Sequence, residues 1–379
     1  MSKYSKEDIL RMVGEEDVGF IRLQFTDVFG TVKNIAVTAG QLEQALNNEC
    51  SFDGSGIDGF VRIEEDDMYL YPDLDSFEIF PWRPQTGKVA RLICDIHKCD
   101  GTPFEGDSRY ILKRVIREAA KMGIYPYIAP ECEFCLFPYD TDGEVMLQTQ
   151  GHGSYFDVAP LDTGENVRRD IILALEDMGI DVRSSYHEHS PYQHEIDLQP
   201  VNALAAADNI VTFRMTCKTI ASRHGLHATF MPKPMNDSDG CGMHLKMTLM
   251  DLEGNNILSD PADSYGLSEL GYHFMAGIMA HVRGLTAVTN PLVNSYKRIV
   301  PGNEAPAYIV WSSGNRSPLI SVPRTSAKDM HIELRNPDPC VNSYLAFAGI
   351  IAAGLEGIKK GLMPQAATCL LYTSPSPRD

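Results

Sequence analysis

The chain has 379 residues, 44% of them hydrophobic and 22% charged, which is an ordinary composition for a globular protein. Its length exceeds what one compact core usually holds and indicates two or more domains. A net charge of -18 argues against a nucleic-acid partner. The sequence shows neither a signal-peptide pattern nor a long apolar run, so we expect a cytoplasmic protein without a membrane span.

The first hundred residues predict a small, strand-rich domain. Ser5 can cap a short amphipathic helix, and alternating runs at residues 20–25 and 32–37 flank a turn at Gly30, as in a hairpin. The other elements expected here are a helix and two strands, at residues 41–46, 61–63 and 89–95. We expect this domain to end near the loop at residues 101–106.

A second region begins with a helix that Asp107 or Ser108 can cap and that ends at Gly123. Strands and helices then alternate. The predicted strands lie at residues 128–137, 182–186, 195–199, 226–230, 243–250 and 331–334, and the predicted helices at 166–178, 203–223, 268–285 and 341–360. This order predicts an α+β fold in which helices back an acid-lined sheet, forming an open funnel for a nucleotide and a small substrate.

The most specific chemical signal is a set of acids, with one histidine, on or beside these strands. Glu131 and Glu133 are two residues apart, as are Glu333 and Arg335, so each pair points to one face of its strand. Gathered carboxylates repel one another unless a cation lies between them, and oxygen ligands with one imidazole suit magnesium or manganese. The candidate ligands are Glu131, Glu133, Glu188, Glu195, His244 and Glu333. The pattern suggests phosphate chemistry.

Arginines occur in two loops that are rich in Gly, Pro, Asn and Ser, at residues 294–306 and 315–319. Such loops carry function more often than packing, and the arginine fork matches carboxylate or phosphate in a bidentate manner. Any one of these arginines, taken alone, also fits an ordinary solvated surface.

Cysteines and clustered histidines give weaker signals. The nine cysteines lack a regular framework and are expected to be reduced thiols. Cys132 and Cys135 form a C-x-x-C pattern, but in an alternating strand residues three apart point to opposite faces. His187, His189 and His194 could form a zinc cluster, but no cysteine or open-site pattern accompanies them, so we rather expect them to lie beside the acids or at the surface.

Several motifs together resemble the bacterial type I glutamine synthetases of the short, alpha form. They include Asp100-Gly-Thr-Pro-Phe-Glu-Gly106, Gln193-His-Glu-Ile-Asp197, the Asn294 to Pro306 loop and Glu333-Leu-Arg335, and the likeness extends to about residue 361. The resemblance implies a small β-grasp-like domain at residues 1–103. It also implies a larger catalytic domain at residues 104–362, with an antiparallel sheet funnel backed by helices.

The resemblance further implies a glutamate-ammonia ligase. It would join ammonia to L-glutamate through γ-glutamyl phosphate, with ATP as a substrate and L-glutamine, ADP and phosphate as products. By the family pattern, two Mg²⁺ or Mn²⁺ ions would be bound, one by Glu133, Glu188 and Glu195, and the other by Glu131, His244 and Glu333. Such ions neutralise a transferring phosphoryl group.

Further site residues are implied by the same likeness. Glu304 would close the site on a flap, bind substrate and accept a proton from ammonium, while Asp53 would help bind ammonium in a neighbouring subunit, which implies a homo-oligomeric ring. Arg62 matches a position of glutamine feedback. The implied glutamate-binding residues are Gly240, Arg298 and Arg335. The implied ATP-binding residues are Lys233, Lys246, Lys328 and Arg316, of which Arg316 would also stabilise phosphoryl transfer.

The chain departs from the family pattern within the implied site. The usual Asn-Gly-Ser-Gly-x-His reads Asp239-Gly-Cys-Gly-Met-His244, which replaces a neutral amide by an acid, and Lys246 stands where a neutral or imidazole side chain is usual. Ser321 and His331 stand where the family has arginines. The tail at residues 363–379 lacks periodicity and does not resemble the family, so we expect the usual C-terminal helical segment to be absent.

Two alternative functions remain open at the level of sequence. One is a γ-glutamyl ligase for another amine, because the metal and ATP parts of the site would be shared; Asp53 favours ammonium, since it can hold a small cation. The other is a catalytically silent paralogue that binds a regulatory protein, which the altered residues Asp239, Ser321 and His331 make conceivable.

Overall fold

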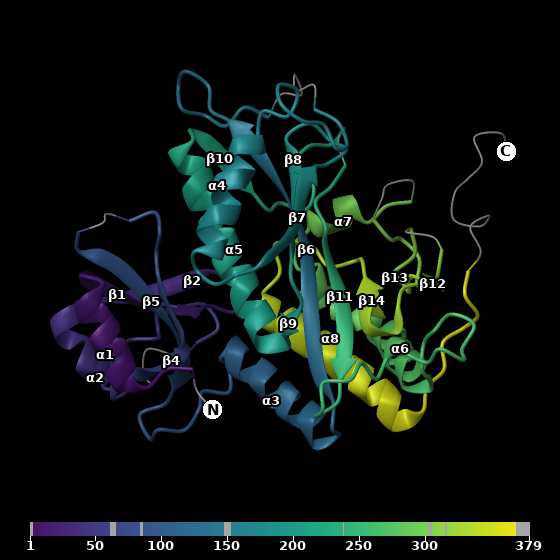
Figure 1. Cartoon of the computed structure of the whole chain (residues 1–379), viewed down its shortest axis with the longest axis horizontal. Coiled ribbons are helices and arrows are strands. Elements are labelled where there is room, and N and C mark those ends of the chain that lie inside the picture. The colour runs from purple at the N-terminus through teal and green to yellow at the C-terminus, as the bar shows by residue number, and fades with distance from the viewer. Residues whose placement is uncertain are drawn as a thin grey trace. The chain divides into compact units, whose positions relative to one another are not determined.

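The computed structural model describes residues 3–60, 66–83, 86–147, 153–237, 239–301, 305–314 and 317–368 (Figure 1). The chain divides into two compact units. The smaller unit comprises Met1–Arg114 and Ala174–Gly179, and the larger comprises Val115–Leu173 and Ile180–Asp379. In the part of the chain that is described, no helix is both long and apolar enough to cross a membrane.

The smaller unit is built on a five-stranded sheet with the strand order β2-β1-β5-β4-β3. The predicted hairpin is confirmed, since β1 and β2 pair antiparallel, whereas β1 and β5 pair parallel. The capping box of α1 is also present: Ser5 Oγ accepts from Asp8 N, and the Asp8 carboxylate accepts from Ser5 N. The elements are α1 (Lys6–Glu15), β1 (Val18–Thr26), β2 (Val32–Thr38), η1 (Ala39–Gln41), α2 (Leu42–Leu46), β3 (Cys50–Phe52), β4 (Met68–Ile79) and β5 (Lys88–His97).

Strand β4 is an element that the sequence did not predict. It is twelve residues long and contains Pro72, which pairs with Cys94 of β5. Proline lacks a donor for the ladder and argues against an interior strand. The register of β4 against β5 shifts between Asp73 and Glu78, which is the kind of irregularity that accommodates such a residue. The strand predicted at residues 61–63 lies outside the described residues.

The larger unit contains a nine-stranded sheet in which β6 (Tyr125–Pro138) is the most highly paired strand. Four strands pair with it, all antiparallel, and in Figure 1 β6 and β11 run side by side. Among the described pairs of this sheet, only β12 with β13 is parallel. The other strands are β7 (Val182–His187), β8 (Gln193–Leu198), β9 (Val201–Asn202), β10 (Leu226–Thr229), β11 (Met243–Met250), β12 (Trp311–Ser312), β13 (Ile320–Ser321) and β14 (Ile332–Leu334).

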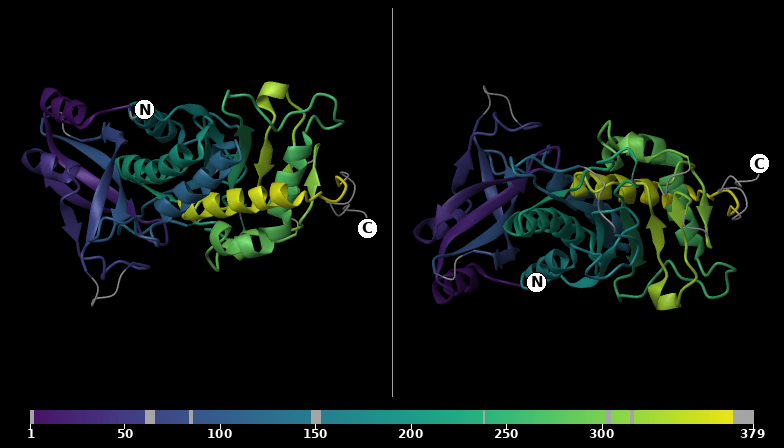
Figure 2. Two further views of the ribbon diagram at one scale, coloured as in Figure 1. Left: turned by 90° about the horizontal axis from the view of Figure 1, so that it is seen from below. Right: turned by 90° about the horizontal axis from the view of Figure 1, so that it is seen from above.

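Helices of the larger unit follow the predicted apolar periodicity. Helix α5 packs on β6 and β10, and α8 packs on both α5 and α6 (Figure 2). Two glycines permit the close α6–α8 contact: a Cβ atom at Gly277 would lie 2.8 Å from the Cα of Gly357, and one at Gly357 would lie 2.7 Å from the Cα of Gly277. The helices are α3 (Ser108–Lys121), which begins in the smaller unit, α4 (Glu165–Glu176), α5 (Ala203–Arg223), α6 (Glu269–Thr289), α7 (Ser295–Arg298), η2 (Ala327–Asp329) and α8 (Ser343–Lys360).

The first residues of the expected tail contact an edge of this sheet. Helix α8 ends at Gly361, which has a left-handed conformation. Beyond it, Trp311 Nε1 donates to the carbonyl of Gln365 (2.7 Å), and Thr368 N donates to the carbonyl of Trp311 (2.9 Å). Gln365 and Thr368 therefore both contact Trp311 of β12.

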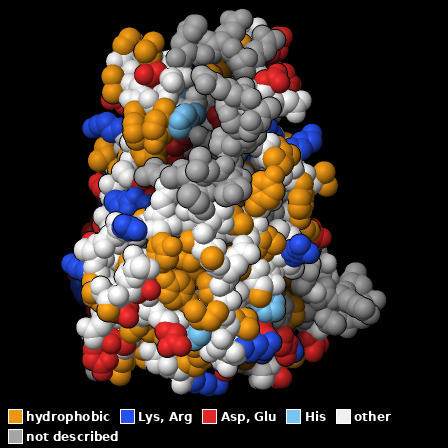
Figure 3. Space-filling model, turned by 90° about the vertical axis from the view of Figure 1, so that its right-hand side faces the viewer, with side chains coloured by type: hydrophobic (Ala, Val, Ile, Leu, Met, Phe, Trp, Pro, Cys, Tyr) orange, Lys and Arg blue, Asp and Glu red, His pale blue; other side chains and the backbone are white. Residues whose placement is uncertain are grey.

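Charged side chains are dispersed over the molecular face shown in Figure 3. Among the residues drawn in colour there, Lys and Arg alternate with Asp, Glu and hydrophobic side chains and do not form one basic patch.

Candidate active site

Strand register gathers the acids onto one face of the larger sheet. Directly paired residues point to the same side, so acids that are distant in sequence become neighbours. Two pairs of acids do this, Glu131 with Asp197 and Glu133 with Glu195, and two further pairs place His244 opposite Glu131 and Lys246 opposite Glu333. The spacing of two residues on which the sequence prediction depended is thus present in three strands, namely β6, β8 and β11.

These side chains line a cavity of about 900 Å³. All six predicted ligands contribute to its wall, although Glu188 lies just beyond the end of β7 rather than within a strand. Arg335 and Lys246 also line the cavity. So do Ser321 and His331, the two residues that stand where the family pattern has arginines. The structure therefore brings predicted residues that are far apart in the sequence together around one cavity.

Glu131, His244 and Glu333 form a group that could hold a metal ion. Each offers one ligand atom, and these atoms lie within 4.8 Å of one another. His244 Nδ1 is 3.9 Å from Glu131 Oε2 and 3.8 Å from Glu333 Oε1. This is the composition of the second ion site that the family resemblance implied.

The other predicted triad is arranged differently. Glu133 and Glu188 line the cavity, but among the described residues Glu195 forms a metal-type group with Glu131 and Asp197. Glu133 Oε2 instead accepts hydrogen bonds from Gln193 Nε2 (2.7 Å) and Gly242 N (3.0 Å).

Asp197 was missed as a candidate, although Glu195-x-Asp197 has the same spacing as Glu131-x-Glu133. This spacing was the signal that could have identified it.

The electrostatics of the cluster favour a bound cation. Burial raises the pKa of Glu133 to about 7, and the nearby Glu188 carboxylate adds to this rise. Burial also raises the pKa of Glu195 well above its usual range, with a further contribution from Glu133. A divalent ion would favour the charged carboxylates and oppose both shifts. The donor set of carboxylates and one imidazole therefore fits such an ion.

Basic side chains already contact the cluster. Lys246 Nζ bonds to Glu131 Oε1, Arg183 Nη2 lies 2.8 Å from the same oxygen, and Arg335 Nη1 bonds to Glu333 Oε1. Arg183 was not predicted. Ser184 pairs with Asp197 of β8, so strict alternation would direct the side chain of Arg183 to the face opposite the acids. The β7–β8 register shifts between Val182 and Ser184, and such a bulge re-aims a side chain.

Arg298 is buried beside the loop that precedes β11. Its Nη1 donates to the carbonyl of Asn336 (3.0 Å) and its Nη2 to the carbonyl of Arg335 (3.2 Å). A Cβ atom at Gly240 would lie 2.8 Å from the Cγ of Arg298, and one at Gly242 would overlap Nη2. Glycine at both positions lets the arginine pass close to the backbone.

The remaining implied residues belong to the smaller unit, lie elsewhere in the larger unit, or fall outside the described residues. Asp53 belongs to the smaller unit and is exposed, with Oδ1 accepting from Ser55 N (2.8 Å). Of the residues that are described, Lys233 and Lys328 do not line the cavity; Lys233 is buried, and Lys328 is exposed on η2. Arg62, Glu304 and Arg316 lie outside the described residues.

Of the three histidines, His189 lies beside a predicted acid, Glu188, whereas His187 and His194 are buried with a different acid, Asp162. His187, His194 and Asp162 form a buried metal-type group. The guanidinium of Arg168 already supplies a cation to it, since Nη1 is 2.6 Å from Asp162 Oδ2 and 2.8 Å from His194 Nδ1. His189 lies elsewhere, and its backbone N donates to Glu188 Oε2.

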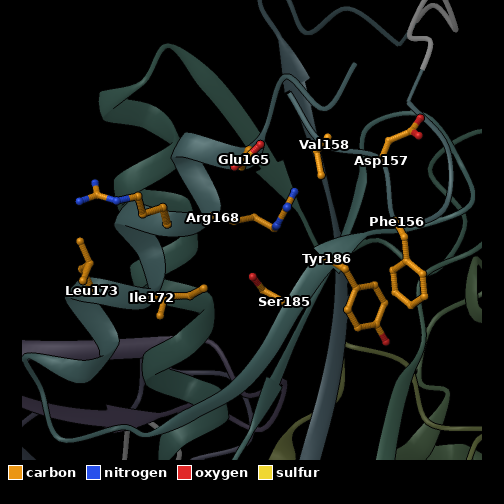
Figure 4. Close-up of a pocket in the computed structure, with 10 residues that line it drawn as sticks. Phe156, Asp157, Val158, Glu165, Arg168, Ile172, Leu173, Ser185 and Tyr186 are labelled. Atoms are coloured by element: carbon orange, nitrogen blue, oxygen red, sulfur yellow. The ribbon is translucent and has the colours of Figure 1, made fainter. Parts of the chain in front are cut away.

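A second cavity, of about 460 Å³, is lined mainly by residues of α4, of β7 and of the segment at residues 156–158 (Figure 4). Phe156 and Tyr186 line both cavities. Tyr186 Oη donates to Glu195 Oε1 (2.7 Å), so this side chain connects the acids to the neighbouring space.

Comparison with known families decides the identity of the fold. Residues 17–99 match the model of the glutamine synthetase beta-Grasp domain, and residues 105–370 match that of the glutamine synthetase catalytic domain. The chain belongs to the glutamine synthetase family. The expected β-grasp domain followed by a larger catalytic domain is thereby confirmed.

Relatives within the glutamine synthetase family are close. The chain is 57% identical to a glutamine synthetase of Clostridium saccharobutylicum over 366 residues, which cover 97% of this chain and 82% of that protein. It is 55% identical to one of Staphylococcus aureus over 360 residues, covering 95% of this chain and 80% of that protein. At this similarity the family reaction, ATP-dependent synthesis of glutamine from glutamate and ammonia with a divalent metal, is assigned to this chain.

Solved structures show the same architecture. A structure titled as a GmaS/ADP complex has a TM-score of 0.87 and 30% identity, covering 95% of this chain and 83% of that chain. A Plasmodium falciparum glutamine synthetase has a TM-score of 0.87 and 27% identity, covering 96% of this chain and 77% of that chain. With the higher identity to curated glutamine synthetases, neither another amine nor a catalytically silent role is favoured.

Proposed function

We propose that glutamine synthesis takes place in the acid-lined cavity of the larger unit, with two Mg²⁺ or Mn²⁺ ions. The observation that supports this most directly is the group Glu131, His244 and Glu333, whose ligand atoms lie within 4.8 Å of one another. Glu133, Glu188 and Glu195 would hold the other ion. When bound, such ions neutralise the transferring phosphoryl group and polarise the acceptor carboxylate.

Glutamate binding is proposed to use Arg335 and the Gly240 segment. Arg335 lines the cavity, and its fork suits a carboxylate. Arg298 is retained from the family resemblance as a glutamate-binding residue, and its hydrogen bonds to the backbone carbonyls of Arg335 and Asn336 would also hold Arg335 in place. The γ-carboxylate of glutamate would attack the terminal phosphate of ATP, and ammonia would then displace phosphate from γ-glutamyl phosphate.

Nucleotide binding is proposed for Lys246 in the cavity, with Lys233, Lys328 and Arg316 retained from the family resemblance. Lys246 is the member of this set that lines the cavity among the described residues, and its ammonium can meet a phosphate once it leaves Glu131. The similar structure titled as a GmaS/ADP complex supports a nucleotide site in this fold.

We further propose a homo-oligomeric ring in which Asp53 serves the site of a neighbouring subunit. Hydrogen bonds from Ser55 lower the pKa of Asp53, which keeps its carboxylate charged, as ammonium binding requires. Glu304 is proposed as the flap residue that accepts the ammonium proton. A cytoplasmic location, glutamine feedback at Arg62 and a regulatory protein partner remain predictions.

The domain boundary is proposed to lie near residue 103, with a catalytic domain at 104–362 and a separate tail at 363–379. Family matches that end at residue 99 and begin at residue 105 support the boundary between the domains, whereas the catalytic-domain match extends to residue 370, into the first residues of the proposed tail.

The decisive experiment measures phosphate release from ATP with glutamate and Mg²⁺ in the presence of ammonium, methylamine or a polyamine. We expect turnover with ammonium at least tenfold above that with either amine, and none after chelation of the metal. A strong preference for a bulky amine would overturn the substrate, and metal-independent turnover would overturn the proposed site.

A further inference from the structure

Two thiols meet beside the acid cluster. Cys135 Sγ, on β6, lies 3.6 Å from Cys241 Sγ, in the loop before β11. Both are free cysteines, and they are 2% and 0% exposed. They pack in a small apolar cluster with Phe137 and Met235. A disulfide has an S–S distance of about 2.05 Å, so the two sulfurs need to approach by roughly 1.5 Å.

This pair differs from the one that the sequence pattern suggested. Cys132 and Cys135 are three residues apart on one strand, so their side chains point to opposite faces. Cys135 and Glu133, two residues apart, instead share a face. The partner of Cys135 therefore comes from a loop 106 residues further along the chain.

The loop that carries Cys241 also positions the site. Gly242 N donates to Glu133 Oε2 (3.0 Å), and the carbonyl of Gly240 accepts from Gln193 Nε2 (3.2 Å). Arg298 fills the space next to both glycines. A movement of Cys241 toward β6 would be transmitted to Glu133 through the hydrogen bond of Gly242, and to Arg298 because that side chain packs close to both neighbouring glycines.

We propose that Cys135 and Cys241 form an oxidation-sensitive dithiol that a hydroperoxide converts to a disulfide, and that this disulfide lowers ligase activity. One sulfur attacks the peroxide oxygen, which gives a sulfenic acid and releases water or an alcohol. The other sulfur then displaces the hydroxyl group as water and closes the S–S bond. The two thiols lose two electrons and two protons, and the peroxide takes up both.

The burial of the pair sets the expected rate. Thiolate is the reactive form, and both contact with Cys135 and burial raise the pKa of Cys241. The first step therefore requires local opening of the loop and is slow. The second step is fast, because the resolving sulfur is already in contact.

The test treats the full chain with hydrogen peroxide, blocks the remaining thiols, and analyses the digest by mass spectrometry. We expect a peptide pair linked through Cys135 and Cys241, together with a severalfold loss of activity that dithiothreitol reverses. Cys135→Ala removes one of the two thiols at a position outside the residues proposed to bind substrate or metal, so it should retain basal activity and resist the reversible loss. The exposed Cys99→Ser serves as the matched control and should behave like the parent chain.

Three outcomes separate the possibilities. Absence of the linked peptide in the parent chain would overturn the proposal, as would a reversible loss that persists in Cys135→Ala. A linked peptide with unchanged activity would support formation of the disulfide but would overturn the proposal that the disulfide lowers ligase activity. The activity measurement rests on the proposed function, whereas detection of the peptide does not, so a failure of either can be distinguished.

Discussion

The guanidinium of Arg298 occupies the space that a side chain at Gly242 would need. A Cβ atom at this glycine would overlap Nη2 of Arg298 and lie 3.3 Å from Oε1 of Glu133. The absence of one carbon atom thus permits a buried arginine and a buried acid to approach the same backbone.

We expect Gly242→Ala to lower kcat/KM for glutamate by about 100-fold or more, since displacements near 1 Å at a catalytic site have effects of this size. Steady-state kinetics with varied glutamate would measure it. Gly284→Ala on α6 is the control, because a Cβ atom there meets nothing within 4 Å; it should be fully active. Equal activity of the two variants would contradict the role given to this close approach.

Glu333→Gln should remove one of two bound ions and nearly all turnover without unfolding the chain. The amide keeps the size of the side chain but is a poorer ligand for a hard cation. Calorimetric titration with Mn²⁺ would count the ions, and circular dichroism would monitor folding. The exposed Glu253→Gln should bind both ions. Unchanged ion stoichiometry in Glu333→Gln would show that the ligand assignment is wrong.

Lys246→Gln should change two affinities in opposite directions. Loss of the ammonium from Glu131 should tighten ion binding by about tenfold, equivalent to about 1.4 kcal/mol, while the KM for ATP should rise. Calorimetry without nucleotide and kinetics with varied ATP separate the two effects. Lys218→Gln, at an exposed position of α5, should change neither. Weaker ion binding in Lys246→Gln would show that Lys246 does not compete with the metal ion for Glu131.

Asp107 should make stability fall as the pH rises. Burial raises its pKa from 3.8 to about 6, so between these values the unfolded chain has lost a proton that the folded chain retains. The free energy of unfolding should therefore decrease by roughly 3 kcal/mol over this range and level off above it.

Chemical unfolding of Asp107→Asn at several pH values should lack this contribution, whereas the exposed Asp67→Asn should keep it. An identical pH profile for Asp107→Asn and the parent chain would exclude Asp107 as the source.

Much of the site could be predicted because its signals are local. The spacing of Glu131 and Glu133 fixes their shared face wherever the strand lies. The contact of Arg183 with Glu131 could not be predicted from residue spacing, because it depends on a register shift between two strands. Lys246 was assigned to the nucleotide, but its contact with Glu131 depends on the pairing of β11 with β6.

The fold shows the same limit. Helix α5 was predicted at its observed bounds, because caps and apolar periodicity are local properties. Strand β4 was missed because Pro72 is unfavourable for a strand by itself, and only its partner β5 makes the pairing evident. The proximity of Cys135 to Cys241 likewise needs tertiary structure.

The central position of β6 restricts how the length of this protein can change during evolution. An inserted or deleted residue between Tyr125 and Pro138 would reverse the side of the sheet on which every later side chain of the strand points, and would do so against four partners at once. The turn at residues 140–143, which follows the strand, carries no such restriction. Natural length variation among descendants of this sequence should therefore collect in such turns, while β6 keeps a constant number of residues.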